Sequence, residues 1–148
     1  MPRVRASATN AVYVHADVTQ EADIAASVDA TLSQLGKLDV LFNNVGGPTG
    51  SAKLAAITDE QIDYGVHLLL SSVILGIRYA VEPMTENGGG SIINNSSIAG
   101  LRYRQGDLLY SAVKAGVTHY SKLAGVELGP LGIRVNVISP GAIATPIF

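Results

Sequence analysis

Short apolar runs and longer amphipathic segments alternate along this chain. Four runs rich in β-branched and other apolar residues are typical of strands, at residues 12–16, 38–42, 91–95 and 133–138. Three longer segments carry apolar residues at helical spacing, at residues 20–35, 58–84 and 107–128. Alternation of this kind predicts an α/β fold with a parallel sheet and helices on both of its faces. The nearly continuous apolar run 38–42 predicts a strand that is covered on both faces.

Residues that favour helix ends and turns support these boundaries. Thr19, with Asp23 nearby, suits the start of the first helix, and Gly36 suits its end. The sequence Thr-Asp-Glu-Gln at 58–61 has the spacing of a capping box and predicts the start of the second helix. The glycines at 88–90 predict the turn that follows this helix.

Composition narrows the class of protein. The chain has 148 residues, of which 47% are hydrophobic and 15% charged, as expected of one globular unit with its own core. A net charge of −2, with scattered basic residues, indicates no nucleic-acid partner. The chain has no cysteine, which suits a cytoplasmic protein. Residues 1–11 lack the apolar core of a signal peptide and are expected to be irregular, and the apolar stretch 68–77 is about half a membrane span, so we expect a soluble protein without a membrane partner.

Tyr110 and Lys114 stand four residues apart in the third helical segment. Positions four apart are neighbours on a helix surface, so the phenol and the ammonium should share one face. Their ordinary pKa values lie near ~10 and ~10.4, and a fixed positive charge beside the phenol favours its ionised form. The pair therefore predicts general acid–base chemistry on an oxygen. Ser97, at the end of the apolar run 91–95, could bring its hydroxyl to the same substrate oxygen.

Four sequence motifs, taken together, resemble the short-chain dehydrogenase/reductase family. They are Asp17-Val18 after the first apolar run, Asn43-Asn44-Val45-Gly46 after the second, Ser97 with Tyr110-x-x-x-Lys114, and Pro140-Gly-Ala-Ile-Ala-Thr145. Val45 stands where the family usually has alanine. The likeness extends from about residue 12 to the last residue. It implies a partial Rossmann-like, doubly wound parallel sheet with flanking helices, as a single incomplete dinucleotide-binding domain over residues 1–148.

The resemblance also implies roles for particular residues. Tyr110 would transfer a proton to or from the oxygen of a secondary alcohol or carbonyl substrate, while hydride passes to or from NAD or NADP. Ser97 would steady that oxygen, and Lys114 would support the tyrosine. The implied cofactor-binding residues are Asp17 and Val18 at the adenine, Asn43, Asn44 and Gly46 on the adenosine side, Tyr110 and Lys114 at the nicotinamide ribose, and Pro140, Gly141, Ile143 and Thr145 at the carboxamide and phosphates. No metal is expected, since His15, His67 and His119 lack ligand spacing.

The chain departs from the family pattern in two respects. It has no glycine-rich turn between a first strand and helix, and we therefore expect a truncated chain, without the family's N-terminal unit and C-terminal lid. The run 12–16 would then lack its neighbouring strand, and would pair against 38–43 or stay unpaired. Leu69 falls where the family usually has an asparagine that holds a water in the proton relay, and leucine cannot hold a water.

Each motif also has a structural interpretation that involves no chemistry. Taken alone, Tyr110 and Lys114 would usually be a surface pair, Ser97 and Pro140 would be turn residues, and Asp17 would cap the first helix. At the level of function, the alternative to an oxidoreductase is a non-catalytic remnant. Its segments 58–84 and 107–128 resemble the helix pair through which this family forms oligomers, and we expect a homo-oligomer in either case. The sequence does not identify the substrate, or the choice between NAD and NADP.

Overall fold

The structure is a computed structural model, and it describes residues 11–50 and 53–143. Most of the segment 1–11, which was expected to be irregular, and Thr145 lie outside the described residues.

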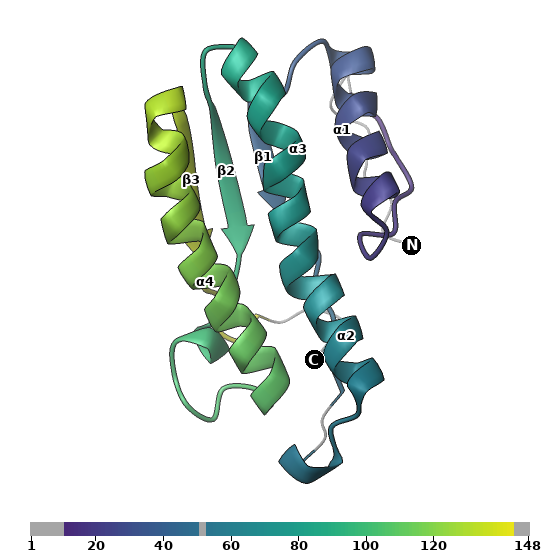
Figure 1. Cartoon of the computed structure of the whole chain (residues 1–148), viewed down its shortest axis with the longest axis vertical. Coiled ribbons are helices and arrows are strands. Elements are labelled where there is room, and N and C mark those ends of the chain that lie inside the picture. The colour runs from purple at the N-terminus through teal and green to yellow at the C-terminus, as the bar shows by residue number, and fades with distance from the viewer. Residues whose placement is uncertain (1–10, 51–52, 144–148) are drawn as a thin grey trace.

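The described residues form a parallel sheet of three strands (Figure 1). The strands are β1 (Val40–Asn43), β2 (Gly90–Asn95) and β3 (Ile133–Ile138), in the order β1-β2-β3. In this register Phe42 lies opposite Ile93, and Asn95 lies opposite Ile138. The predicted α/β class and parallel sheet are confirmed.

Helices connect the strands, as the alternation predicted. The longer helices are α1 (Glu21–Leu35), α2 (Asp59–Val66), α3 (Ser72–Glu86) and α4 (Leu108–Leu128). A π-helical turn, η2 (His67–Ser71), joins α2 to α3, so one nearly continuous rod replaces the single helix predicted at 58–84. Short 3₁₀ turns are η1 (Leu54–Ala56), η3 (Ile98–Gly100) and η4 (Gly129–Leu131).

Among the described residues, helices cover one face of the sheet and not both, so that prediction was wrong for this part of the chain. The helices α3 and α4 pack on the strands, and α1 packs beside α3 (Figure 1). The chain moves in one direction across the sheet, from β1 to β2 to β3, and right-handed crossovers in one direction all lie on the same face. On the other face Val40 is 55% exposed and Phe42 is 50% exposed, so β1 is not covered on both sides as expected.

The core lies between the sheet and the helices α3 and α4. Side chains from every layer meet there, and those with no more than 4% exposure are Val73, Ile77, Ala80, Met84, Ile92, Val117 and Ile133. Removing such side chains from water is the main favourable contribution to folding, at roughly 25 cal/mol per Å² of apolar surface. The segments that carry the candidate site are therefore held on a packed scaffold.

The run at 12–16, predicted as a strand, is irregular in the structure. It pairs with no strand among the described residues, and β1 pairs only with β2 there. Tyr13 is 83% exposed. A β-prone sequence forms a strand only when a neighbour completes its backbone hydrogen bonds and covers one face. In the described residues no strand pairs with this run, although one edge of β1 is free.

The helix-end predictions were mostly right. Gly36 ends α1 in the left-handed conformation, with φ of 88°. Thr58 and Gln61 form the predicted capping box of α2. Thr19 does not cap α1, because the N-cap position is taken by Gln20, which makes no side-chain capping bond. The glycines after α3 form the predicted turn, with positive φ at Gly88 and Gly89.

The α2–α3 rod satisfies the length and composition of a membrane span. It runs over Asp59–Glu86, 28 residues with a mean hydropathy of 1.4, and it is the single such helix in the part of the chain that the structure describes. It is longer than the stretch 68–77 that the sequence analysis considered. Its apolar residues Ile77, Ala80 and Met84 are buried in the protein's own core, as in the central helix of a globular domain.

Candidate active site

Lys114 is a buried cation at the carboxyl end of the sheet. It lies on α4 and is 3% exposed. Its Nζ donates a hydrogen bond of 2.7 Å to the backbone carbonyl of Asn95, the last residue of β2. Burial disfavours the charged form and lowers the pKa of Lys114 to about 8. A side chain of this kind is rare in a protein interior without a functional reason, because charge is costly to bury.

Tyr110 lies one turn before Lys114, as the spacing predicted. The Nζ atom of Lys114 is 5.7 Å from the centroid of the Tyr110 ring. The ring packs against a small apolar cluster that contains Leu69 and Val113. The predicted pairing of phenol and ammonium is therefore present in the structure.

Asp107 fixes the start of α4 and so the position of Tyr110. Its Oδ1 accepts a hydrogen bond of 2.8 Å from the backbone N–H of Tyr110, as an N-cap carboxylate does. Thr49, which is 3% exposed, donates to the same oxygen at 3.3 Å. The loop that follows β1 is thereby tied to the helix that carries Tyr110.

Ser97 stands directly beyond β2, at the start of η3. Its Oγ accepts a hydrogen bond of 3.1 Å from the N–H of Ala99. The neighbouring Ile98 donates its N–H to the carbonyl of Pro140 at 2.9 Å, so the pairing of β2 and β3 continues past both strands. Ser97, Lys114 and Pro140 therefore gather at the carboxyl ends of β2 and β3, where open parallel sheets bind their ligands.

Two buried polar networks hold this edge of the sheet, and neither was predicted from the sequence. In the first, Ser96 Oγ bonds to the carbonyl of Lys114 and to the hydroxyl of Thr118, both at 2.7 Å. In the second, Asn43 Nδ2 donates to Asn94 Oδ1 at 2.8 Å, and Asn94 Nδ2 donates to Ser121 Oγ at 2.9 Å. Asparagines inside predicted strands were the available signal, since a buried amide needs partners on neighbouring elements.

The side chains of the predicted residues at the end of β1 point in two different directions. The side chain of Asn43 turns inward to Asn94, while Asn44 is exposed and its Oδ1 accepts a bond of 2.7 Å from Asn95 Nδ2. Gly46 is exposed, and an added Cβ there would meet no atom within 4 Å. The described structure therefore brings the two asparagines to the site and places no steric demand on Gly46.

Asp17 and Val18 lie before α1, apart from the catalytic candidates in the sequence. The carboxylate of Asp17 accepts bonds from the N–H and the hydroxyl of Thr19, at 2.9 and 2.8 Å, and these bonds lower its pKa. This agrees with the local interpretation of Asp17, although it forms a turn before the helix and not the cap itself. Val18 packs against the apolar cluster that also contacts Tyr110.

The last predicted residues extend past β3. Gly141 and Ile143 are exposed, the latter by 56%. Thr145 lies outside the described residues. Within the described part of the chain, Pro140 is the residue of this motif that is tied to the site, because its carbonyl accepts the hydrogen bond from the N–H of Ile98, next to Ser97.

Leu69 occupies the π-helical turn and is 1% exposed. It packs with Leu68 and Val113, beside Tyr110. The position at which the resemblance implies a relay asparagine is therefore filled by a buried apolar side chain within an apolar cluster.

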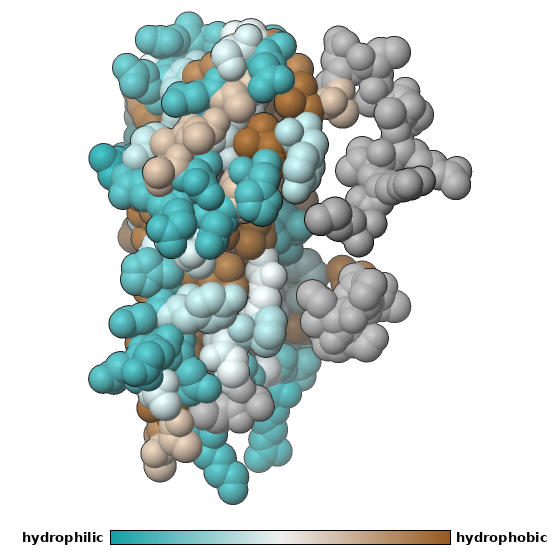
Figure 2. Space-filling view, turned by 90° about the vertical axis from the view of Figure 1, so that its right-hand side faces the viewer, coloured by the Kyte–Doolittle hydropathy of each residue, from teal (hydrophilic) through white to brown (hydrophobic). Residues whose placement is uncertain are grey.

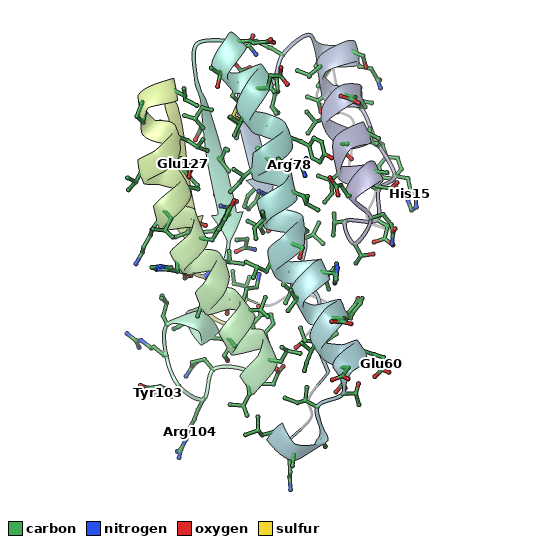
Figure 3. All side chains as sticks on the ribbon, viewed as in Figure 1. His15, Glu60, Arg78, Tyr103, Arg104 and Glu127 are labelled. Carbon is green, nitrogen blue, oxygen red and sulfur yellow. The ribbon has the colours of Figure 1, made fainter. Side chains whose placement is uncertain are left out.

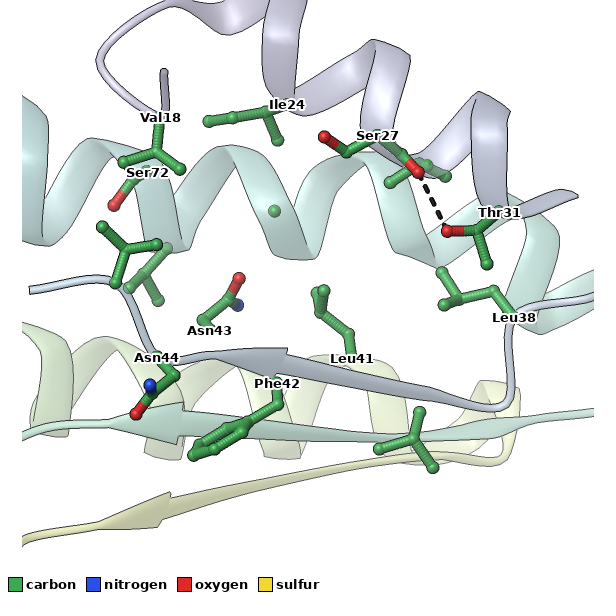
Figure 4. Close-up of a pocket in the computed structure, with 15 residues that line it drawn as sticks. Val18, Ile24, Ser27, Thr31, Leu38, Leu41, Phe42, Asn43, Asn44 and Ser72 are labelled. Carbon is green, nitrogen blue, oxygen red and sulfur yellow. Dashed lines mark hydrogen bonds between the residues drawn. The ribbon is translucent and has the colours of Figure 1, made fainter. Parts of the chain in front are cut away.

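A cavity of about 370 Å³ lies beside the free edge of β1, between β1, α1 and α3 (Figure 4). Val18, Asn43, Asn44 and Ser72 line it, among mostly apolar side chains, but Ser97, Tyr110 and Lys114 do not. The chemistry-bearing residues are therefore not in this cavity. In the described residues, no cluster of histidine, aspartate and glutamate has the arrangement of a metal site.

The exposed loop between η3 and α4 borders the site. Tyr103 is 97% exposed and Arg104 has a positive φ of 60°, and both lie near the N-terminal end of α4 (Figure 3). Higher in the same view, Arg78 of α3 bonds to Glu21 of α1 at 3.2 Å (Figure 3). The first group borders the candidate site, whereas the second joins two helices away from it.

Comparison with known proteins identifies similar chains. A sequence model of the family described as "Enoyl-(Acyl carrier protein) reductase" matches residues 2–148. The 3-alpha-(or 20-beta)-hydroxysteroid dehydrogenase of Mycobacterium tuberculosis is 46% identical over 136 residues, which is 91% of this chain and 52% of that protein. The levodione reductase of Leifsonia aquatica is 37% identical over 132 residues, 89% of this chain and 49% of that protein.

Solved structures agree with the sequence matches. The L-sorbose reductase of Gluconobacter frateurii, solved with NADPH and L-sorbose, superposes with a TM-score of 0.85 at 32% identity, over 90% of this chain and 50% of that one. The structure of levodione reductase superposes with a TM-score of 0.85 at 37% identity, over 89% of this chain and 51% of that one. The chain thus spans about half the length of the relatives it matches.

Proposed function

Since this chain belongs to the short-chain dehydrogenase/reductase family, we propose that it carries the catalytic part of an oxidoreductase that acts on a secondary alcohol or carbonyl. The observation that supports this most strongly is the buried Lys114, with its Nζ 5.7 Å from the centroid of the Tyr110 ring. A surface pair would not hold the ammonium in the interior, beside a phenol, at the carboxyl end of a parallel sheet.

In this proposal the residues of the chain move and steady a proton. Tyr110 transfers it at the substrate oxygen, and Ser97 donates a hydrogen bond to the same oxygen. The positive charge of Lys114 stabilises the phenolate oxygen when the proton has left. Asp107 holds the tyrosine in place through its backbone. A bound nicotinamide cofactor would supply the hydride chemistry.

The polar groups at the site fit such a cofactor. Lys114 has three N–H donors, and the structure gives one of them a protein acceptor, the carbonyl of Asn95. Asn95 Oδ1 is a buried acceptor without a hydrogen-bond partner among the described residues. A ribose, which both accepts and donates hydrogen bonds, complements these groups. Asn43, Asn44 and Pro140 are proposed to border the same site, together with the remaining residues that the family resemblance implied.

Further properties of the whole protein belong to this proposal. NAD or NADP would be the cofactor, and the relatives leave the preference open. We infer a cytoplasmic protein, because its residues include no cysteine, and a homo-oligomer formed through α2, α3 and α4. The alternative, a non-catalytic remnant, is not favoured, because the buried Lys114 and its hydrogen bond are retained, and relatives at up to 46% identity are named as dehydrogenases and reductases.

The test supplies the segments of the relatives that this chain does not cover. Joining the 148-residue chain to the remaining segments of a close relative should give nicotinamide-dependent turnover of alcohols or ketones. In that chimera Tyr110→Phe keeps the ring and removes the transferable proton, so turnover should fall by on the order of a hundredfold or more. Tyr120→Phe, a second tyrosine of α4, serves as the matched control and should leave turnover nearly unchanged. Full turnover by Tyr110→Phe would contradict the assignment of Tyr110.

A further inference from the structure

Asn95 connects the catalytic lysine to the end of a different strand. Its backbone carbonyl accepts the hydrogen bond from Lys114 Nζ at 2.7 Å. Its side-chain Nδ2 donates a hydrogen bond of 2.7 Å to Oδ1 of Asn44, just past β1. One residue at the end of β2 therefore contacts both the buried cation of α4 and the loop after β1.

One end of the Asn95 amide remains without a partner. Its Oδ1 is buried, and no hydrogen-bond donor contacts it in residues 11–50 and 53–143. It is the single buried side-chain oxygen or nitrogen of that kind in those ranges. Leaving a buried acceptor unsatisfied costs roughly 1–3 kcal/mol, so an unpaired amide next to a candidate active site suggests that a ligand supplies the missing donor.

The position of Asn95 in the sheet supports a ligand contact. Asn94 faces the helices, where it is 0% exposed and bonds to Ser121 of α4. Successive side chains of a strand point to opposite faces, so the side chain of Asn95 lies on the face that the helices leave open. It also stands at the carboxyl end of the middle strand, the edge at which parallel sheets bind nucleotides.

We propose that Asn95 Oδ1 belongs to the nucleotide site and accepts a hydrogen bond from a ribose hydroxyl on the nicotinamide half of the cofactor. Lys114 is a pure donor and Asn95 Oδ1 a pure acceptor, so the two together match the neighbouring hydroxyls of a ribose, which accept and donate. This inference rests on the proposed function, and it adds a residue that binds the ribose. Asn95 is thus a binding residue and does not transfer the proton.

The test uses nicotinamide mononucleotide and the 148-residue protein. This ligand carries the nicotinamide and its ribose without the second nucleotide half, so millimolar concentrations can report on the local contacts. A titration followed by ¹⁵N-resolved NMR should shift the amide resonances of Asn95, Tyr110 and Lys114. Asn95→Leu should weaken binding about threefold to tenfold, as expected for the loss of one hydrogen bond.

Two comparisons distinguish the contribution of Asn95 Oδ1 to binding from that of the rest of the side chain. Asn44→Ala breaks the same Asn95–Asn44 bond but keeps Oδ1, and should weaken binding less than Asn95→Leu does. The second comparison uses two analogues of the ligand, one without the 2′ hydroxyl and one without the 3′ hydroxyl. The wild type should bind one of the two analogues more weakly than the complete ligand. The Asn95→Leu variant should bind that analogue and the complete ligand with equal affinity. If Asn95→Leu lacks a dispersed spectrum, Asn95→Ser takes its place in both comparisons.

The possible failures are distinguishable. Equal affinity of wild type and a folded Asn95 variant would overturn this inference and leave the proposed function intact. Absence of any ligand-dependent shift near Tyr110 and Lys114 in the wild type would overturn the proposed nucleotide site itself.

Discussion

At the scale of the residue, the site depends on a charge that the fold makes costly. Lys114 is 3% exposed, and within the described residues its Nζ donates one hydrogen bond, to the carbonyl of Asn95. Because burial lowers its pKa from 10.5 to about 8, folding is penalised while the lysine is protonated in both states. A lysine beside a phenol on a packed helix is therefore retained at the expense of stability, as expected at functional sites.

The pH dependence of stability should report this penalty. Below pH 8 the lysine is charged in both the folded and the unfolded chain, and the whole penalty applies. Between about pH 8 and 10.5 the folded chain loses this proton first, so the unfolded chain binds more protons and the free energy of unfolding rises with pH. Relative to wild type, Lys114→Met should lack this rise, which is on the order of 1–3 kcal/mol. Urea titrations of both proteins at pH 7 and pH 10 measure this difference. An equal change in the free energy of unfolding of the two proteins between these pH values would contradict the shifted pKa.

At the scale of the element, the close approach of α3 to β1 depends on a missing side chain. A Cβ on Gly76 would lie 2.5 Å from Oδ1 of Asn43. Asn43 in turn donates to Asn94, which donates to Ser121 of α4. Gly76 therefore leaves room for a row of hydrogen-bonded side chains that connects β1, β2 and α4 beneath the helices.

Glycine-to-alanine changes in the two long helices should have opposite effects. Alanine usually stabilises a helix interior by up to ~1 kcal/mol relative to glycine. Gly116→Ala in α4 should do so, since its Cβ would contact Leu70 at 3.6 Å, an ordinary van der Waals distance. Gly76→Ala should instead destabilise by roughly 1–3 kcal/mol, because Asn43 must move. Thermal denaturation of the two variants tests this. A Gly76→Ala variant that is more stable than the wild type would show that the hydrogen bonds from Asn43 to Asn94 and Ser121 are dispensable.

At the scale of the whole molecule, the described chain leaves sheet surface open. One edge of β1 is unpaired among the described residues, and on the face away from the helices Val40 and Phe42 are half exposed. On α4, Leu123 is 56% exposed and Val126 is 80% exposed. Figure 2 views the molecule from the side of α1 and shows hydrophobic residues between hydrophilic ones on that side as well.

Open edges and apolar faces of this kind favour association. We therefore expect the 148-residue chain to form a dimer, a higher oligomer or an aggregate. Light scattering over a wide range of protein concentration measures this. A single monomeric species throughout would contradict the expectation and would indicate that the chain covers these surfaces itself.

Cofactor affinity also belongs to this scale. In doubly wound sheets the pyrophosphate is bound by backbone N–H groups of a glycine-rich turn at a helix N-terminus, and this sequence contains no such turn. Several lost charge-assisted bonds, each worth roughly 1.5–3 kcal/mol, weaken binding by several powers of ten. Calorimetric titration of the 148-residue chain with NAD and with NADP should show no binding in the micromolar range. Micromolar affinity in a folded sample would mean that another segment replaces the turn.

The sequence by itself determined most of the helices and strands, and the pairing of Tyr110 with Lys114 on one helix face. Helical spacing placed Tyr110 and Lys114 on one face, and the capping residues Thr58 and Gln61 and the terminal Gly36 marked their helix ends. These are local properties, because a helix completes its hydrogen bonds and defines its faces within a few residues. The resemblance to the family added Ser97 and the residues at the strand ends.

Only the tertiary structure decided what depends on distant partners. Among the described residues the β-prone run 12–16 is irregular because no strand pairs with it, and the helices lie on one face because both crossovers run in the same direction. The burial of Lys114 and the bonds of Asn95 also follow from contacts between segments far apart in the sequence, such as α4 with β2. A backbone carbonyl carries no residue-type signal, so the acceptor that holds the lysine became visible only after the chain was folded.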